Sequence, residues 1–172
     1  IGRRNVPKTG AVILASNHLS ALDSFFIPVV IPRKVTFLAK AAYFHGKGFS
    51  GWFVKNFLLM VGQIPMDRSG GAASSDSLNS GLVALSEGKM LGIYPEGTRS
   101  PHGDLYRGKT GIARLVLAAG VTVIPVSVSG TDRILPKGKR LPRLPRVTVT
   151  VGDPIDFSRF AQVGSGEGAA AI

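Results

Sequence analysis

Two residues near the start of the chain, His18 and Asp23, have types and a spacing that suit acid–base chemistry. They follow an apolar run at residues 11–15, which is typical of a buried strand. A neutral imidazole can take a proton from a hydroxyl, while a carboxylate fixes the tautomer of the ring and stabilises the imidazolium that forms. Because partners on a straight helix stand three or four residues apart, a spacing of five requires a turn between strand and helix. Taken alone, the pair also fits a loop histidine and an aspartate at a helix start, where the helix dipole favours negative charge.

The composition describes one globular domain with a large positive charge. The chain has 172 residues, 44% of them hydrophobic and 18% charged, which is enough for one core and too few for two ordinary domains. Lys and Arg number 21 against 10 Asp and Glu, a formal net charge of +11. This excess predicts an anionic partner, such as nucleic acid, an acidic membrane face or a phosphorylated substrate.

The residue types that are absent or rare exclude several kinds of chemistry. The sequence has no cysteine, which excludes disulfides, thiolate metal ligands and a cysteinyl acyl intermediate. Its 3 histidines show no metal-binding spacing, so neither a metal nor another cofactor is expected. No apolar run reaches the roughly 18 residues of a membrane span. Because the sequence begins at Ile1 and not at a methionine, we expect an N-terminal segment to be missing.

Strand-like and helix-like patterns alternate along the chain. Apolar runs predict strands at residues 12–15, 35–39, 62–68, 90–94, 121–128 (broken at Pro125) and 147–151. Helical patterns occupy residues 22–30, 49–61, 74–87 and 110–119. This alternation predicts a single-domain α/β fold, with a largely parallel central sheet flanked by helices in three αβα layers. Residues 1–160 would form the domain, and the Gly- and Ala-rich residues 161–172 a flexible tail.

Two of the predicted helices are rich in apolar residues, on one face of the helix at 74–87 and around most of the circumference of the helix at 49–61. In the helix at 74–87, the face is assigned to Leu78, Leu82, Val83 and Leu85. The helix at 49–61 has aromatic residues, including Trp52, clustered at its start. A core helix is the simpler interpretation of this segment. The alternative is a helix in the lipid interface, where Trp and Phe are favoured.

The sequence has no motif that would supply a nucleophile to the His18–Asp23 pair. The sequence has neither a Gly-x-Ser-x-Gly elbow nor a Gly-rich phosphate loop ending in Gly-Lys-Ser/Thr. The remaining interpretation is a base that acts on a hydroxyl brought by the substrate. The acceptor alcohol then stands where the serine of a Ser-His-Asp triad would be, and the group is transferred directly in a ternary complex.

Two arginines follow other predicted strands. In parallel sheets, functional residues gather at the carboxyl ends of the strands, where the loops of His18, Arg68 and residues 96–99 are expected to meet. A guanidinium beside Gly and Thr can bind two phosphate oxygens at once, which suits both Arg68 and Arg99. A surface or ion-paired arginine is the alternative for each. Lys109 is close enough in sequence to join such a site, although a solvated position is the simpler interpretation.

The segment at residues 133–146 is strongly basic. It carries six basic residues and no acid, with aliphatic residues interleaved. Basic charge beside Leu and Ile suits an anionic membrane surface. Nucleic-acid binding is disfavoured, because the segment has no aromatic residue to stack on bases. A solvated basic hairpin is the remaining alternative.

These residues together resemble the glycerolipid acyltransferases of the lysophosphatidic acid acyltransferase type. The family is recognised by four ordered blocks. Here they are a His-x4-Asp block at 17–23, a glycine-led strand ending in arginine at 62–68, Tyr-Pro-Glu-Gly-Thr-Arg-Ser at 94–100, and an apolar strand with an inner proline at 123–126. The resemblance covers residues 12–151, and its first and third blocks are the specific ones.

The resemblance implies a glycerol-3-phosphate acyltransferase-like fold and an O-acyltransferase of phospholipid synthesis. The acyl group would move from acyl-CoA or acyl carrier protein to lysophosphatidic acid or glycerol 3-phosphate. His18 would be the general base and Asp23 its partner, Pro125 would support the pocket or acyl chain, and the acceptor phosphate would be lined by Arg68, Glu96, Gly97, Thr98 and Arg99. The protein would be peripheral on the cytoplasmic face of a membrane, with the missing N-terminal segment as a candidate anchor.

The sequence departs from the family pattern in two places. Tyr94 stands where phenylalanine is usual, and Pro65 and Met66 stand where bulky apolar residues are commoner. Two alternatives stay open. One is acylation of another lysolipid or glycolipid acceptor, and the other is a non-catalytic module that binds anionic lipid or nucleic acid.

Overall fold

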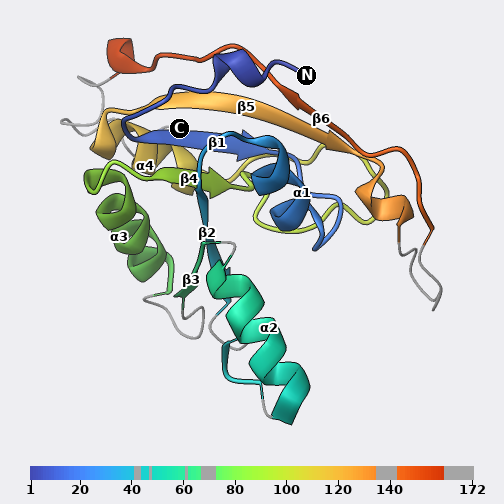
Figure 1. Cartoon of the computed structure of the whole chain (residues 1–172). Coiled ribbons are helices and arrows are strands. Elements are labelled where there is room, and N and C mark those ends of the chain that lie inside the picture. The colour runs from blue at the N-terminus through green and yellow to red at the C-terminus, as the bar shows by residue number, and fades with distance from the viewer. Residues whose placement is uncertain (41–43, 47, 61, 67–72, 135–142, 161–172) are drawn as a thin grey trace.

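A mostly parallel sheet forms the centre of the molecule (Figure 1). The computed structural model describes residues 1–40, 44–46, 48–60, 62–66, 73–134 and 143–160. Within these residues the sheet has six strands in the order β3-β2-β4-β1-β5-β6, with parallel pairing from β3 to β5 and β6 antiparallel to β5. The strands are β1 Val12–Ser16, β2 Val35–Lys40, β3 Gln63–Met66, β4 Met90–Ile93, β5 Thr122–Ser129 and β6 Thr148–Val151.

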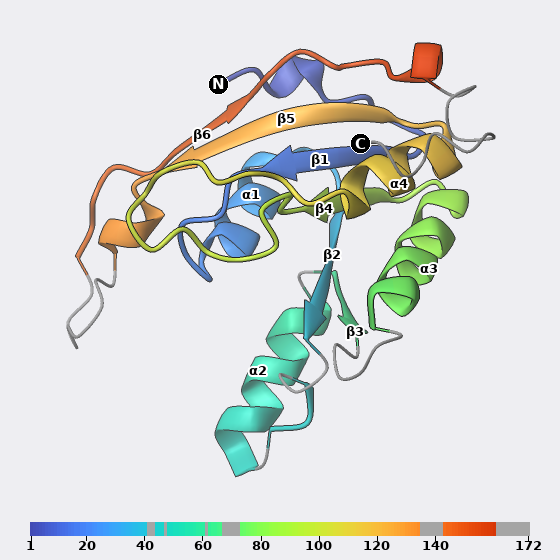
Figure 2. The same cartoon turned by 180° about the vertical axis from the view of Figure 1, so that it is seen from behind.

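Helices cover both faces of the sheet, which confirms the predicted α/β architecture. They are α1 Asp23–Val30, α2 Gly48–Met60, α3 Ala73–Ser86 and α4 Gly111–Ala119. Helix α1 lies on one face, and α3 and α4 lie on the other (Figure 2). Successive residues of β1, Ile13 and Leu14, are both buried and belong to the two different core clusters. A strand covered on both faces is apolar throughout, which explains the unbroken apolar run.

The expected break of the fifth strand at Pro125 is wrong, because β5 is continuous from Thr122 to Ser129. Proline cannot donate a ladder hydrogen bond, so within a sheet it needs a place where no partner is lost. Strand β6 ends at Val151, and beyond it Gly152 N–H donates to the Pro125 carbonyl at 2.8 Å. The chain then bulges and pairs again at Ile155 with Val123. The missing N–H therefore faces a gap in the ladder.

The predicted apolar face of α3 is correct except for Val83. Leu85 is buried and Leu78 and Leu82 are partly buried, whereas Val83 is exposed. At about 100° per residue, Val83 lies roughly 140° around the helix from Leu78. On the buried face, Gly81 lets α3 approach α4 closely, since a Cβ there would lie 2.9 Å from Leu115 Cδ2.

Helix α2 is not a core helix on all sides. It extends away from the sheet, beyond β2 and β3 (Figures 1 and 2). The side chains of Phe49, Trp52, Phe53 and Leu59 are exposed. In the described part of the chain, no helix is long and apolar enough to cross a membrane.

Candidate active site

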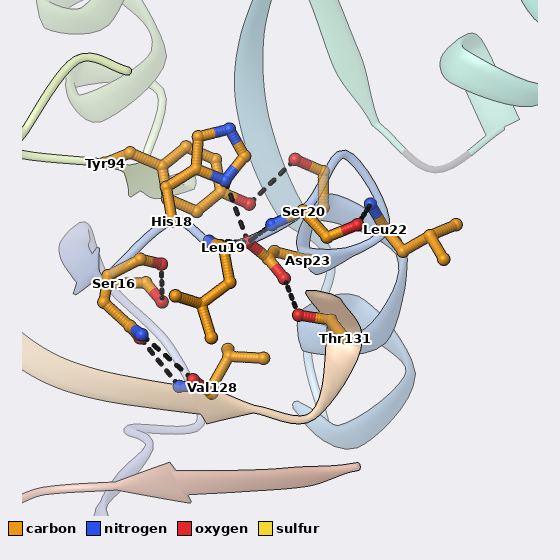
Figure 3. Close-up of polar contacts among 11 residues, drawn as sticks. Ser16, His18, Leu19, Ser20, Leu22, Asp23, Tyr94, Val128 and Thr131 are labelled. Atoms are coloured by element: carbon orange, nitrogen blue, oxygen red, sulfur yellow. Dashed lines mark hydrogen bonds and ion pairs between the residues drawn. The ribbon is translucent and has the colours of Figure 1, made fainter. Parts of the chain in front are cut away.

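The turn between β1 and α1 holds the predicted pair. Residues 17–22 form this turn, and α1 begins at Asp23 itself. The side chain of Asn17 anchors the turn to β5, since its Oδ1 accepts from Val128 N–H at 2.8 Å and its Nδ2 donates to the Val128 carbonyl at 2.9 Å (Figure 3). This amide pairing continues the sheet by one residue and fixes the backbone that leads to His18.

His18 and Asp23 are in direct contact (Figure 3). His18 Nδ1 lies 2.9 Å from Asp23 Oδ2, which also accepts from the backbone N–H groups of Leu19 at 2.7 Å and Ser20 at 2.8 Å. Asp23 Oδ1 accepts from the hydroxyl of Thr131 at 2.5 Å. Both oxygens of a fully buried carboxylate are thus hydrogen-bonded, as a buried charge requires.

Hydrogen bonding keeps Asp23 ionised. Burial by itself raises the pKa of Asp23, but the hydrogen bonds from His18, Ser20, Thr131 and Leu19 outweigh it and leave the pKa below its usual value. Because a carboxylate can only accept, His18 Nδ1 carries the ring proton. The lone pair therefore resides on Nε2, which points away from Asp23 (Figure 3). The His18 side chain is 16% exposed, so a substrate can reach it.

Tyr94 fixes the plane of the imidazole. The ring of Tyr94 stacks on the imidazole of His18, with centroids 3.8 Å apart and an angle of 11° between the planes. The Tyr94 ring also stacks on Phe37 of β2, with centroids 5.4 Å apart. The Tyr94 hydroxyl is 2.8 Å from the hydroxyl of Ser24, the second residue of α1. Burial raises the pKa of the Tyr94 phenol well above its usual value, so the hydroxyl stays neutral. The hydroxyl that distinguishes Tyr94 from phenylalanine thus ties β4 to α1.

The loop after β4 lies against the His18 turn. Ser100 N–H donates to the His18 carbonyl at 2.7 Å, which brings Arg99 and Thr98 next to this link; both are exposed. Gly97 turns the loop with a φ of 69°. A Cβ at Gly97 would lie 3.2 Å from Lys109 Nζ, so the structure also brings this lysine to the loop.

The other predicted site residues lie in different surroundings. Glu96 is 5% exposed, and its Oε2 has no hydrogen-bond partner among the residues that the structure describes. Arg68 lies outside the described residues. Pro125 pairs with Ala15 in the sheet and its ring lies against Gly152, so it is not brought to His18. Its predicted support of a pocket or acyl chain stays a prediction.

The sequence reasoning missed three residues that shape the site: Asn17, Ser24 and Thr131. A polar residue directly after a buried strand was an available signal for Asn17. Thr131 stands 108 positions from Asp23 in the chain, so no local pattern could connect them. In the described ranges, no group of three or more His, Asp or Glu side chains is arranged to hold a metal ion.

Comparisons with known proteins identify the family of the chain. The model of the family described as Acyltransferase matches residues 1–129. The chain is 28% identical to the 1-acyl-sn-glycerol-3-phosphate acyltransferase of Borreliella burgdorferi over 79% of the chain and 52% of that protein. It is 27% identical to the Bacillus subtilis enzyme of the same name, over 99% of the chain and 79% of that protein.

A solved structure shares the fold. The crystal structure of the 1-acyl-sn-glycerophosphate acyltransferase PlsC from Thermotoga maritima superposes with a TM-score of 0.72 at 25% identity, over 99% of this chain and 64% of that one. The chain spans about half the length of several curated relatives that it matches. The family model matches most of the length of this chain, so the chain belongs to the acyltransferase family.

Proposed function

We propose that this chain carries the acyl-transfer centre of a lysophosphatidic acid acyltransferase. The observation that carries the proposal is the His18–Asp23 contact, with Nδ1 held by an ionised carboxylate and Nε2 free to accept a proton. The names of the curated relatives, 1-acyl-sn-glycerol-3-phosphate acyltransferases, support lysophosphatidic acid as the acceptor. Glycerol 3-phosphate is the smaller alternative acceptor, and acyl-CoA or acyl carrier protein is the proposed thioester donor.

The proposed reaction needs only the substrate's hydroxyl as nucleophile. His18 Nε2 takes the hydroxyl proton while the oxygen bonds to the thioester carbonyl carbon. The carbon–sulfur bond then breaks, and the imidazolium returns the proton to the leaving thiolate. Asp23 holds the ring and stabilises its positive charge during transfer. The products are the acylated acceptor and a free thiol.

The loop at residues 95–100 is the proposed site of the acceptor phosphate. Arg99 offers a fork of donors to phosphate oxygens, and Arg68 is proposed to add a second one. Gly97 and Thr98 supply a turn with exposed polar groups. Glu96 is proposed to accept a hydrogen bond from an arginine or from an acceptor hydroxyl, because a carboxylate has no donor to offer the phosphate.

The proposed location is the cytoplasmic face of a membrane, as a peripheral protein. The net charge of +11 supports an anionic surface as partner. Nucleic acid is a less suitable partner, since the basic segment lacks stacking residues. Part of that segment, residues 135–142, lies outside the described residues.

Thiol release tests the proposal directly. The protein is mixed with acyl-CoA and lysophosphatidic acid, and the released CoA is titrated with a thiol reagent; the protein has no cysteine and adds no background. We expect His18→Ala to lower turnover by about a hundredfold or more. Arg99→Ala should raise the acceptor KM by about tenfold with little change in kcat, while Arg4→Ala, another exposed arginine, serves as control.

Three outcomes would contradict the proposal. Full turnover by His18→Ala would exclude the general base, and an unchanged acceptor KM in Arg99→Ala would exclude that arginine from the phosphate site. Release with a different lysolipid but not with lysophosphatidic acid would reassign the acceptor.

A further inference from the structure

Helix α2 presents an exposed apolar face, formed by four of its described side chains. Its members Phe49, Trp52, Phe53 and Leu59 are 81%, 59%, 59% and 46% exposed. At about 100° per residue, all four fall within roughly a third of the helix circumference. The rings of Phe49 and Trp52 stack on each other with their centroids 6.0 Å apart. These two aromatic side chains therefore contact each other within the helix itself.

The opposite side of α2 packs against the segment that leads into the helix. Gly51 lies about 200° around the helix from Phe49 and is buried against the backbone of Gly46. The contact is so close that a Cβ on Gly51 would overlap the Gly46 carbonyl. The helix projects away from the sheet beyond β2 and β3 (Figures 1 and 2), and the exposed fractions of Phe49, Trp52 and Phe53 show that their side chains face solvent.

The polar residues of the helix suit an interface between water and lipid. Asn56 lies within the apolar face, but its Nδ2 donates to the Trp52 carbonyl at 2.8 Å, so the helix itself satisfies one of its donors. Lys55 is exposed beside the face, and α2 contains no acidic residue. An aromatic face with a lysine at its border is typical of helices that lie in the headgroup region.

We propose that α2 is a membrane-docking helix that inserts Phe49, Trp52 and Phe53 into the headgroup region of a bilayer containing anionic lipid. The proposal rests on the proposed function, since an enzyme acting on lysophosphatidic acid must reach a lipid surface. The net charge of +11 supplies attraction to that surface. The strand before α2, β2, carries Phe37, whose ring stacks on Tyr94 beside His18. Docking through α2 therefore keeps the candidate active site close to the membrane.

Trp52 is the only tryptophan in the sequence and reports on the helix directly. Vesicles of phosphatidylcholine and phosphatidylglycerol in equal parts should shift its fluorescence to the blue, and brominated phosphatidylcholine should quench it. We expect Phe49→Ser with Phe53→Ser to weaken vesicle binding by about a hundredfold, since burying each ring is worth about one decade in affinity. Lys55→Gln should weaken it by about fivefold with anionic vesicles only.

Matched measurements separate docking from other roles of the helix. Leu105→Ser removes an exposed apolar side chain elsewhere and should leave vesicle binding unchanged. Thiol release with detergent-dispersed lysophosphatidic acid should be equal in wild type and the Phe49/Phe53 double variant, which shows that the fold and the site are intact. A protein that docks but shows no acyl transfer would refute the proposed function and keep this inference.

Two results would overturn the inference. One is the absence of bromolipid quenching of Trp52 while acyl transfer proceeds. The other is a Trp52 shielded from iodide before any vesicle is added, because a second copy or another part of the protein would then cover the face. Sedimentation of the same sample identifies a dimer if that is the cause.

Discussion

Asp23 carries a buried negative charge, and each of its hydrogen-bond partners has a distinct role. His18 is the group to be oriented, the N–H groups of Leu19 and Ser20 close the turn, and Thr131 reaches across from the end of β5. Leaving one buried acceptor unsatisfied costs about 1–3 kcal/mol. The residues around Asp23 therefore control both the orientation of the imidazole and the stability of the turn.

Thr131→Val tests the role of the least obvious partner. Valine keeps the shape of threonine but cannot donate to Asp23 Oδ1, so the carboxylate can shift relative to His18. We expect kcat to fall by about tenfold with little change in the acceptor KM. Thr131→Ser keeps a hydroxyl and should restore most of the loss. An equal kcat in the valine and serine variants would show that the hydroxyl does not position the site.

The same bond predicts a pH dependence of stability. The pKa of Asp23 is lowered in the folded state from the usual 3.8, so its contribution is present above that pH and is lost as the pH falls through the lowered folded value. Urea unfolding of wild type and Thr131→Val should therefore differ at neutral pH and converge in acid. A difference that stays constant down to acid pH would exclude the ionised carboxylate as its source.

At the scale of elements, three strands are linked to the imidazole through stacked rings. Phe37 of β2 lies across Gly92 of β4, Tyr94 follows β4, and His18 follows β1. A Cβ at Gly92 would lie 2.4 Å from the Phe37 ring, so only glycine leaves room for that ring. The stack of rings therefore depends on Gly92, a residue without a side chain.

Gly92→Ala should disturb the site from a distance. The added methyl must displace Phe37, which costs about 1–3 kcal/mol of stability, and the shift should reach Tyr94 and lower kcat. Gly111→Ala is the matched control, because a Cβ there meets nothing within 4 Å and alanine favours the helix. Thermal unfolding and thiol release measure both effects. Equal behaviour of the two variants would refute the role of the stack.

At the scale of the whole molecule, Arg33 joins segments that lead into the central strands. Its guanidinium donates to the carbonyls of Pro7 at 2.9 Å, Gly10 at 2.9 Å and Gly88 at 3.4 Å. Gly10 precedes β1 and Gly88 precedes β4, so these contacts lie at the amino ends of the strands, whereas the His18 turn lies at the carboxyl end of β1. The role of Arg33 is therefore structural.

Arg33→Ala should destabilise the fold and spare the chemistry. Loss of the charged donors is expected to cost about 2 kcal/mol in urea unfolding, while KM and kcat of the folded protein stay the same. Arg33→Lys keeps the charge but cannot reach three carbonyls, so it should recover only part of the stability. A large change in kcat at full folding would contradict this division between the two ends of the sheet.

The sequence correctly predicts the alternation of strands and helices, the parallel sheet and the pairing of His18 with Asp23. These depend on local periodicity and on a spacing of five residues, which are written in the chain. The sequence pattern wrongly assigned Val83 to the buried face of α3 and wrongly predicted a break of β5 at Pro125. The neighbours that decide burial and strand hydrogen bonding are distant in sequence.

The surroundings of the pair and the position of the apolar surface depend on how distant parts of the chain pack together. Thr131 and Tyr94 reach the site through packing of β5 and β4 against the β1 turn, and no local pattern encodes such contacts. In the sequence, a core helix was the simpler interpretation of the apolar residues of α2, and a lipid-interface helix was the alternative. The exposure of Phe49, Trp52 and Phe53 was decided by the way α2 projects from the sheet, which no local pattern encodes.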